Sequence, residues 1–276
     1  MKTPQRITSP ANPQIKQVVR FQRQASERRD AGRFCLEQAR MLAAALEAGF
    51  EVLQVYQVTE QLDDADRRLI GRCGVEPTEV TEQVLAKIAY RKNPGAWVAV
   101  LRARSRTLEE APSEWTGPLV VCAGLEKPGN LGAILRSADA AGVEAVFIDN
   151  PQPDLYNPNL VRASAGAVFG ASVYPGEPET IARKLRSAGV PMVGLTPFGR
   201  DDYRQADLTA PRALVVGAED RGLGGFWQQA VDATVRIPMA GSVDSLNVSV
   251  AAALVLFQMQ PTHGRGGSND YDGPGG

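Results

Sequence analysis

Three short segments in the second half of the chain carry the polar side chains best placed to do chemistry. They are residues 127–136 (KPGNLGAILR), 217–223 (GAEDRGL) and 237–249 (IPMAGSVDSLNVS). Each lies beside an apolar run and combines small residues with a few polar ones, which is typical of a loop where a strand ends. Because open α/β sheets bind ligands at the carboxyl ends of their strands, we expect the functional site to be built from these segments.

The first segment contains a candidate helix cap and a candidate functional arginine. Asn130 is placed to cap the helix that follows, and Gly132 allows another backbone to approach closely. Arg136 comes one turn after Gly132, and its apolar neighbours predict a largely buried helix in which an unpaired arginine would be costly. A functional role for Arg136 is therefore one interpretation, and a solvated surface arginine is the other.

The second and third segments add acidic, hydroxyl and amide side chains. Glu219 comes directly after an apolar strand, and Gly222 permits a tight turn, although a structural helix cap explains this pattern equally well. Ser245 is placed to cap the last helix of the domain. Asn247 is a poor helix former inside the first helical turn, so we expect it to make hydrogen bonds.

Several common kinds of site are disfavoured by the sequence. Residues 124–132 do not fit Gly-x-Gly-x-x-Gly, and no Gly-x-x-x-x-Gly-Lys-Ser/Thr occurs, so NAD or ATP held in the usual way is not expected. The single histidine, His263, lies in a Gly-rich tail, which argues against histidine-based catalysis and a zinc hydrolase site. Cys35, Cys73 and Cys122 are widely spaced, so we expect buried thiols, with no disulfide framework and no metal.

Composition places the chain among soluble globular proteins, and its charge is unevenly distributed. The 276 residues are 43% hydrophobic and 22% charged, with a net charge of −1. No apolar run suggests a signal peptide or a membrane span, so we expect a cytoplasmic protein. Residues 1–106 contain 18 Lys and Arg against 12 Asp and Glu, whereas residues 107–276 contain 12 against 19.

The positive charge of the first part is concentrated in two places. One is residues 1–40. The other is residues 91–106, which contain no acidic residue and carry Arg91, Lys92, Arg102, Arg104 and Arg106. Such clusters can contact phosphates and steer a nucleic acid toward a protein of slight negative charge. A solvated helix face is the alternative interpretation.

A polar, Pro-containing stretch divides the chain into two α/β parts. We predict a first domain over residues 1–106, a linker over 107–117, a second domain over 118–262 and a disordered tail over 263–276. In the first part, 33–37 leads into a helix over 38–48, followed by a strand over 51–58, a helix over 65–73 and a strand over 96–102. Gly49 is placed to end the first of these helices.

The second part alternates regularly between strands and helices. Strands are predicted at 119–125, 145–149, 191–195, 213–217 and 234–237, and helices at 131–141, 179–188 and 226–230. Near-continuous apolar strands that alternate with helices indicate a parallel sheet covered on both faces. Residues 246–259 predict an apolar helix packed deep in the domain.

Taken together and in this order, the three segments resemble the signature motifs of the SPOUT superfamily, in particular the SpoU/TrmH-type RNA ribose 2′-O-methyltransferases. The resemblance covers residues 118–260, and Ala218 departs from it, because the family more often has Asn or another small polar residue there. Residues 1–106 resemble more loosely a ribosomal-protein-like substrate-binding domain. The resemblance implies a deep trefoil knot, S-adenosylmethionine bound in its loops, and a homodimer whose active site the partner completes.

The resemblance also implies a role for each candidate residue. Arg136 matches the catalytic arginine, and because a guanidinium is a poor general base, we expect it to stabilise the developing alkoxide and hold a phosphate. The residues expected to orient Arg136 and the RNA are Asn130, Glu219, Ser245 and Asn247. The residues expected to surround the cofactor are Leu195, Thr196, Gly217, Ile237, Met239 and Leu246. Arg162 and Arg33 are the expected RNA contacts, and no metal is expected.

The separate N-terminal module favours 23S rRNA as the substrate. The alternatives are a tRNA 2′-O-methyltransferase, a non-catalytic RNA-binding protein of the same fold, and a base methyltransferase of the same superfamily. A nucleotide-dependent oxidoreductase is disfavoured because both common phosphate loops are missing.

Overall fold

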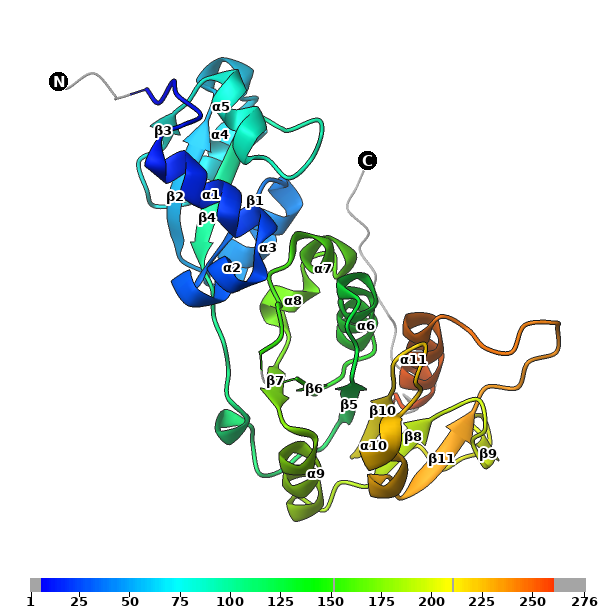
Figure 1. Ribbon diagram of the computed structural model, residues 1–276. Helices are drawn as coiled ribbons and strands as arrows, with labels where there is room; N and C mark the ends of the chain where they lie inside the picture. Colours follow the sequence, from blue (N-terminus) through cyan, green and yellow to red (C-terminus); the bar gives the residue numbers. More distant parts are fainter. Residues whose placement is uncertain (1–5, 151, 210, 261–276) are drawn as a thin grey trace, which may run out of the picture.

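In the computed structural model, which describes residues 6–150, 152–209 and 211–260, the chain forms two α/β modules, each built on one sheet (Figure 1). We call residues 6–102 the N-terminal module and residues 118–260 the C-terminal module. Their sheets have the strand orders β1-β4-β2-β3 and β7-β6-β5-β10-β8-β11-β9. The predicted tail over 263–276, with His263, lies outside the described residues.

The N-terminal module is a mixed sheet between two layers of helices. Its strands are β1 (Arg33–Leu36), β2 (Val52–Gln57), β3 (Thr78–Glu79) and β4 (Trp97–Arg102). Its helices are α1 (Pro13–Arg23), α2 (Ala25–Ala31), α3 (Ala39–Glu47), α4 (Asp64–Gly71) and α5 (Glu82–Ile88). Alternate residues of β4 point to opposite faces, so that Val98 and Val100 pack with α1 and α5, and Ala99 and Leu101 pack with α3 and α4.

The elements predicted for this module are confirmed to within two residues at each end, and Gly49 ends α3 with a positive φ of 75°. Helices α1, α2 and α5 were not predicted. The start of α1 nevertheless has a clear local signal: Pro13 occupies the first turn, and the Asn12 side chain accepts a hydrogen bond of 2.9 Å from the Gln14 N–H.

The C-terminal module is a sheet in which every neighbouring pair of strands is parallel. Its strands are β5 (Pro118–Ala123), β6 (Ala145–Asp149), β7 (Val173–Gly176), β8 (Met192–Leu195), β9 (Asp201–Asp202), β10 (Arg212–Val216) and β11 (Ala233–Arg236). One face is covered by α6 (Pro128–Ala140), α7 (Pro158–Ala163), α8 (Ala167–Gly170) and α11 (Val248–Gln258). The other face is covered by α9 (Pro178–Ser187) and α10 (Gly224–Ala230).

The predicted parallel sheet with helices on both faces is confirmed, and its five predicted strands are all present. Strands β7 and β9 and helices α7 and α8 were missed. Strand β7 contains Pro175 and Gly176, which are uncommon inside strands, and α7 and α8 are too short to show a helical period.

The stretch predicted as a linker packs on the C-terminal module. It contains a 3-10 turn, η2 (Leu108–Glu110), and its buried residues Leu108, Ala111 and Trp115 join the core beneath α9 and α10. The three cysteines are buried and free, as predicted, and burial raises the pKa of the Cys122 thiol to about 12. No helix in the described part of the chain is long and apolar enough to cross a membrane.

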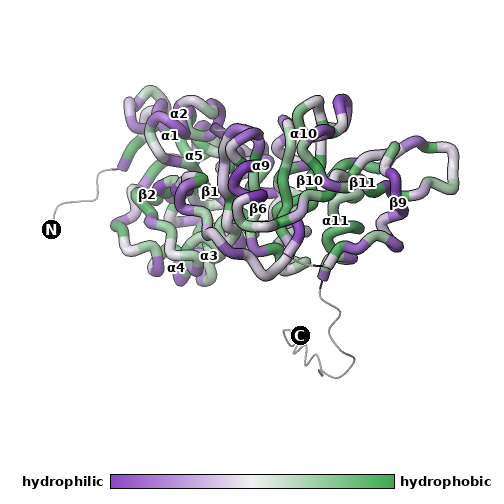
Figure 2. Tube along the Cα trace, turned by 90° about the horizontal axis from the view of Figure 1, so that it is seen from below, coloured by the Kyte–Doolittle hydropathy of each residue, from purple (hydrophilic) through white to green (hydrophobic). Residues whose placement is uncertain are grey.

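Helix α11 forms where the sequence predicts it, but the prediction that it is packed deep in the domain is wrong. Its buried residues are Ala252, Val255 and Leu256, whereas Val250, Leu254 and Phe257 are 49%, 42% and 50% exposed. We call these three residues the α11 apolar face. Figure 2 colours this helix largely as hydrophobic. The sequence could not distinguish the two sides because the helix is apolar all round.

The two modules share a continuous core that fixes them against each other. Arg28 of α2, only 4% exposed, pairs with Asp154 of the C-terminal module through both carboxylate oxygens, and its Nη1 donates to the Phe21 carbonyl at 2.7 Å. Beside this pair, the rings of Phe34 and Tyr156 stack with their centroids 4.2 Å apart. A hydrogen-bonded charge pair and stacked rings therefore cross the junction.

Three of the arginines suggested as phosphate contacts instead make contacts within the protein. Arg102 pairs with Glu51, and Arg104 donates to the carbonyls of Ala48 and Gly49 at the end of α3. Arg106 donates to Ser172 Oγ at 2.8 Å. These side chains connect residues 102–106 to Glu51, to the end of α3 and to the C-terminal module.

The junction pair gives a stability prediction. Arg28→Met leaves Asp154 without its buried partner, so we expect the free energy of unfolding to fall by about 3 kcal/mol. The matched control is Arg20→Met, which removes an exposed ion pair with Glu27 and should cost less than about 1 kcal/mol. Urea unfolding followed by circular dichroism measures both, and equal losses would contradict the account.

Candidate active site

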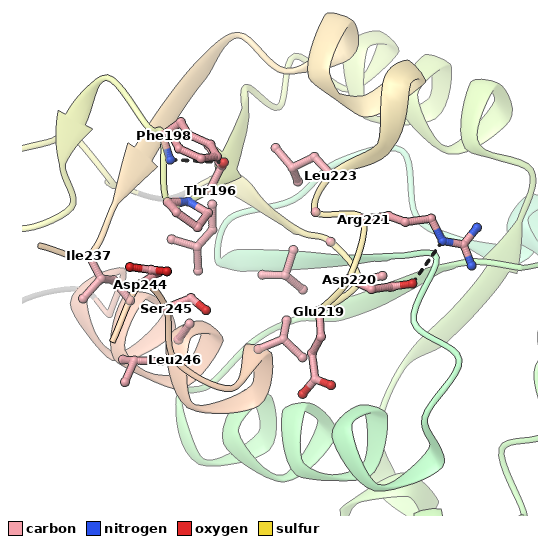
Figure 3. Close-up of a pocket in the computed structure, with 18 of the residues that line it drawn as sticks. Thr196, Phe198, Glu219, Asp220, Arg221, Leu223, Ile237, Asp244, Ser245 and Leu246 are labelled. Carbon is pink, nitrogen blue, oxygen red and sulfur yellow. Dashed lines mark hydrogen bonds and ion pairs between the residues drawn. The ribbon is translucent and has the colours of Figure 1, made fainter. Parts of the chain in front are cut away.

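The carboxyl ends of three adjacent strands surround a cavity of about 570 Å³ (Figure 3). Strands β10, β8 and β11 lie side by side in that order, and all run in the same direction. Their following loops supply the walls: residues 195–198 and 216–223 with Ile237 and Met239, closed by residues 244–248 at the start of α11. Ligand binding at this edge is what the parallel sheet predicts.

Glycines allow the loops to approach one another closely. A side chain on Gly217 would overlap the backbone of Gly222, so this position excludes every other residue. Gly222 has a positive φ of 62°, and its N–H donates to the Ala218 carbonyl at 2.9 Å, which closes the turn predicted there. On α6, a Cβ at Gly132 would lie 2.5 Å from the Leu160 carbonyl oxygen, which confirms the predicted close approach.

The Glu219 carboxylate brings the three sequence segments together. Asn130 Nδ2 donates to Glu219 Oε1 at 3.0 Å, and Asn247 Nδ2 donates to the same oxygen at 2.6 Å. Asn247 Nδ2 also lies 3.2 Å from Asn130 Oδ1, and Lys127 Nζ pairs with Glu219 Oε2. In Figure 3 the Glu219 side chain extends from its loop toward α6. We call these four residues the Glu219 cluster.

Two capping predictions are wrong. Helix α6 begins at Pro128 after Lys127, so Asn130 lies inside the first turn, and its amide binds Glu219 instead of capping the helix. Helix α11 is capped by Asn247, whose Oδ1 accepts from the Ser249 N–H at 2.9 Å, and not by Ser245. Asn247 therefore serves as a cap through its oxygen and as a donor to Glu219 through its nitrogen.

The cluster keeps its carboxylate ionised. Hydrogen bonds from Lys127 and Asn130 lower the pKa of Glu219, and the same carboxylate raises the pKa of Lys127. A carboxylate with a lowered pKa is a poor proton acceptor, so the geometry favours a positioning role over general base catalysis. Lys127 was missed as a candidate, although it is the first residue of the first segment.

Arg136 lies on the solvent side of α6. The helix buries Leu131, Ile134, Leu135 and Ala138 against the sheet, and Arg136 is exposed on the opposite side. The expectation of a buried arginine is wrong for the single chain, because the apolar flanks of Arg136 occupy the other side of the helix. Within the described residues, Arg136 has no hydrogen bond or ion pair and does not line the cavity.

The remaining candidates separate into two groups. The residues expected to surround a cofactor all line the cavity: Leu195, Thr196, Gly217, Ile237, Met239 and Leu246. Ser245 lines it as well. Arg33, at the start of β1, and Arg162, on α7, are exposed and lie outside the cavity lining. Phe198, which sequence analysis did not single out, is 94% exposed at the cavity edge (Figure 3). Among the described residues, no group of His, Cys, Asp and Glu could hold a metal ion.

Family models match both modules. The SpoU rRNA Methylase family matches residues 117–257, which is half of the chain, and the MRM3-like substrate binding domain matches residues 12–99. The chain belongs to the SpoU rRNA methylase family. This confirms the family resemblance of the three segments.

Similar members of the SpoU family act on RNA, according to their names. The chain is 32% identical to a 23S rRNA (uridine(2479)-2′-O)-methyltransferase from Streptomyces viridochromogenes over 92% of this chain and 91% of that one. It is 37% identical to the 23S rRNA (guanosine-2′-O-)-methyltransferase RlmB from Nitrosomonas europaea, over 77% of this chain and 85% of that protein.

Solved structures of RNA methyltransferases match over nearly the whole chain. The crystal structure of an RNA 2′-O ribose methyltransferase has 40% sequence identity and a TM-score of 0.80, covering 92% of this chain and 97% of that chain. An AdoMet-bound rRNA methyltransferase from Sinorhizobium meliloti has 30% identity and a TM-score of 0.80, covering 92% and 96%. The two-module architecture is therefore shared with these proteins.

The lowered pKa of Glu219 gives a pH prediction. Because the pKa of Glu219 is lower in the folded protein, its carboxylate stabilises the fold at any pH above the usual glutamate pKa of 4.5. This stabilisation is lost as the pH falls through the lowered pKa. We expect the melting temperature of Glu219→Gln to lie below that of the wild type by a constant amount from neutral pH down to 4.5, and the two to converge at lower pH. If the two melting temperatures already converge above pH 4.5, the ionised Glu219 carboxylate is not the cause of the difference.

Proposed function

We propose that this chain is an S-adenosylmethionine-dependent RNA ribose 2′-O-methyltransferase that acts on 23S rRNA. The observation that carries the proposal is the Glu219 cluster, which joins three separate segments at the edge of a cavity in a SpoU family sheet. The similarity to named 23S rRNA 2′-O-methyltransferases over most of the chain supports the substrate. A tRNA substrate remains the alternative from sequence, and the N-terminal module favours rRNA.

The cavity fits the cofactor in size and lining. Its volume of about 570 Å³ lies within the usual range of small-molecule sites. Apolar side chains from the ends of β8 and β11 suit a planar adenine, and backbone groups at the strand ends suit the polar edges of an adenosine and an amino acid. S-adenosylmethionine, when bound, supplies an electrophilic methyl group on a sulfonium. We assign Leu195, Thr196, Gly217, Ile237, Met239 and Leu246 to its binding.

The protein's own part in methyl transfer is to align groups and stabilise charge. Asn130, Glu219 and Asn247 hold the start of α6 and the start of α11 in one arrangement, which fixes the geometry of approach. Arg136, always protonated, stabilises the alkoxide as the ribose 2′-hydroxyl loses its proton to solvent or to a phosphate oxygen. Ser245 at the cavity edge and Arg162 and Arg33 outside it contact the RNA.

A homodimer accounts for the placement of Arg136. In one chain, Arg136 lies outside the cavity lining, and α6 packs beside α11, whose apolar face is exposed. A second copy seated on the α11 apolar face would cover it and bring Arg136 of the partner subunit to the cavity. Sedimentation equilibrium should give twice the chain mass of 29.6 kDa, and a stable monomer would contradict this part of the proposal.

Three further features belong to the same proposal. The chain end forms a deep trefoil knot around the cofactor loops, as the family resemblance implies. Residues 1–106 form the RNA-binding domain and residues 118–262 the methyltransferase domain, which the two family matches support. The protein works in the cytoplasm.

The reaction product tests the proposed function. An unmodified 23S rRNA transcript is incubated with the protein and S-adenosylmethionine, digested to nucleosides and analysed by mass spectrometry. A 2′-O-methylated nucleoside is expected. A base-methylated nucleoside, or the same yield from tRNA as from rRNA, would contradict the proposal.

Substitution of Arg136 tests its assigned role. Arg136→Ala should reduce kcat about a hundredfold, because it removes charge stabilisation that acts in the transition state, and leave the Kd for S-adenosylmethionine unchanged. The control is Arg183→Ala, which removes an exposed arginine from α9 on the other face of the sheet. An equal loss of cofactor binding in Arg136→Ala would mark the residue as structural.

A further inference from the structure

A second candidate site lies in a shallow groove between the two modules. Residues from α1, the end of β1, the loop after α5, and α7 line it. The polar and aromatic lining residues include Gln22, Glu37, Tyr90, Arg91 and Arg162. We call this the junction groove. It lies apart from the cofactor cavity, with which it shares no lining residue.

The floor of the groove contains an unsatisfied donor. Gln22 is 3% exposed, and its Nε2 has no hydrogen-bond partner among the described residues. A buried amide without an acceptor is costly, so such groups are rare in folded proteins. An oxygen acceptor seated in the groove would satisfy it.

One wall holds an aromatic ring and an arginine on a fixed backbone. The Glu37 carboxylate accepts from the Tyr90 N–H at 2.9 Å and from the Arg91 N–H at 3.0 Å, which anchors the loop to the end of β1. The Tyr90 side chain is 43% exposed. Unlike Arg102, Arg104 and Arg106, Arg91 and its neighbour Lys92 have no side-chain hydrogen bond or ion pair within the described part of the chain.

The other wall is attached to the helix that carries Arg136. Nη2 of Arg162, on α7, donates to Asn159 Oδ1 at 3.2 Å. The residue is exposed, so the other guanidinium donors can reach a ligand. Helix α7 packs directly on α6, where the Leu160 carbonyl meets Gly132. In Figure 1, α7 and α8 lie beside the N-terminal module. A ligand held here is thus held in a fixed position relative to α6.

We propose that the junction groove binds one single-stranded RNA nucleotide that flanks the methylated one. Its phosphate lies against Arg91 and Arg162, its base stacks on Tyr90, and an oxygen accepts from Gln22. Exposed aromatic rings beside arginines are the usual means of holding single-stranded nucleic acid. The groove has a volume of about 40 Å³, well below that of a small-molecule pocket, so the nucleotide would lie across its surface and not inside it.

This inference rests on the proposed function and is tested with the same 23S rRNA transcript. Tyr90→Ala should weaken RNA binding about tenfold through lost stacking, with little change in its salt dependence. Arg91→Gln should also weaken binding and lower the slope of log Kd against log salt by about 0.7, which is one phosphate contact. Both variants should raise the KM for RNA and leave kcat and the Kd for S-adenosylmethionine unchanged.

The matched control is Arg183→Gln, which removes the same charge from α9 and should bind RNA as the wild type does. Filter binding over a range of KCl concentrations and initial rates supply the measurements. The inference is overturned if Tyr90→Ala and Arg91→Gln bind like the wild type, or if Arg183→Gln weakens binding equally. Failure of the proposed function is distinguished at the outset, because the wild type would then not methylate the transcript.

Discussion

The candidate active site depends on one carboxylate that accepts hydrogen bonds from two amides and pairs with an ammonium group. Glu219, at the end of β10, receives Asn130 and Lys127 from the start of α6 and Asn247 from the cap of α11. These segments are far apart in the sequence. The loop after β10 meets the start of α6 because β5 and β10 are parallel neighbours, and α11 packs against both β10 and α6. A charge that several donors hold in place cannot move without breaking all of those bonds, so the loops around the cavity keep one arrangement.

The rest of the fold holds the cavity and the candidate residues in fixed positions relative to that cluster. The parallel sheet aligns the loops that form the cavity, and α6 links the cluster at its first turn to Arg136 two turns later. At Gly132, α6 packs closely against α7, and α7 forms one wall of the junction groove. The buried pair of Arg28 and Asp154 then fixes the N-terminal module at that junction. The cavity, Arg136 and the groove therefore belong to one connected body.

The sequence predicted the sheet, the three segments and the cavity lining, because apolar strands and glycine-rich loops follow local rules. It failed where a side chain had two possible partners. Asn130 and Ser245 both suited a helix cap, and only the tertiary arrangement shows that Asn130 binds Glu219 and that Asn247 caps α11. The exposure of Arg136 and of the α11 apolar face depends on which side of each helix meets the sheet, and an almost wholly apolar helix such as α11 does not reveal this.

The most direct test of the account is a double-mutant cycle on the two amides that meet at Glu219. The kcat of Asn130→Ala, Asn247→Ala and the double variant is measured on the same RNA. If the two amides act as one unit through the carboxylate, the double variant should lose about as much activity as the worse single variant. Losses that multiply would show that the two residues act independently and would contradict the central role of Glu219.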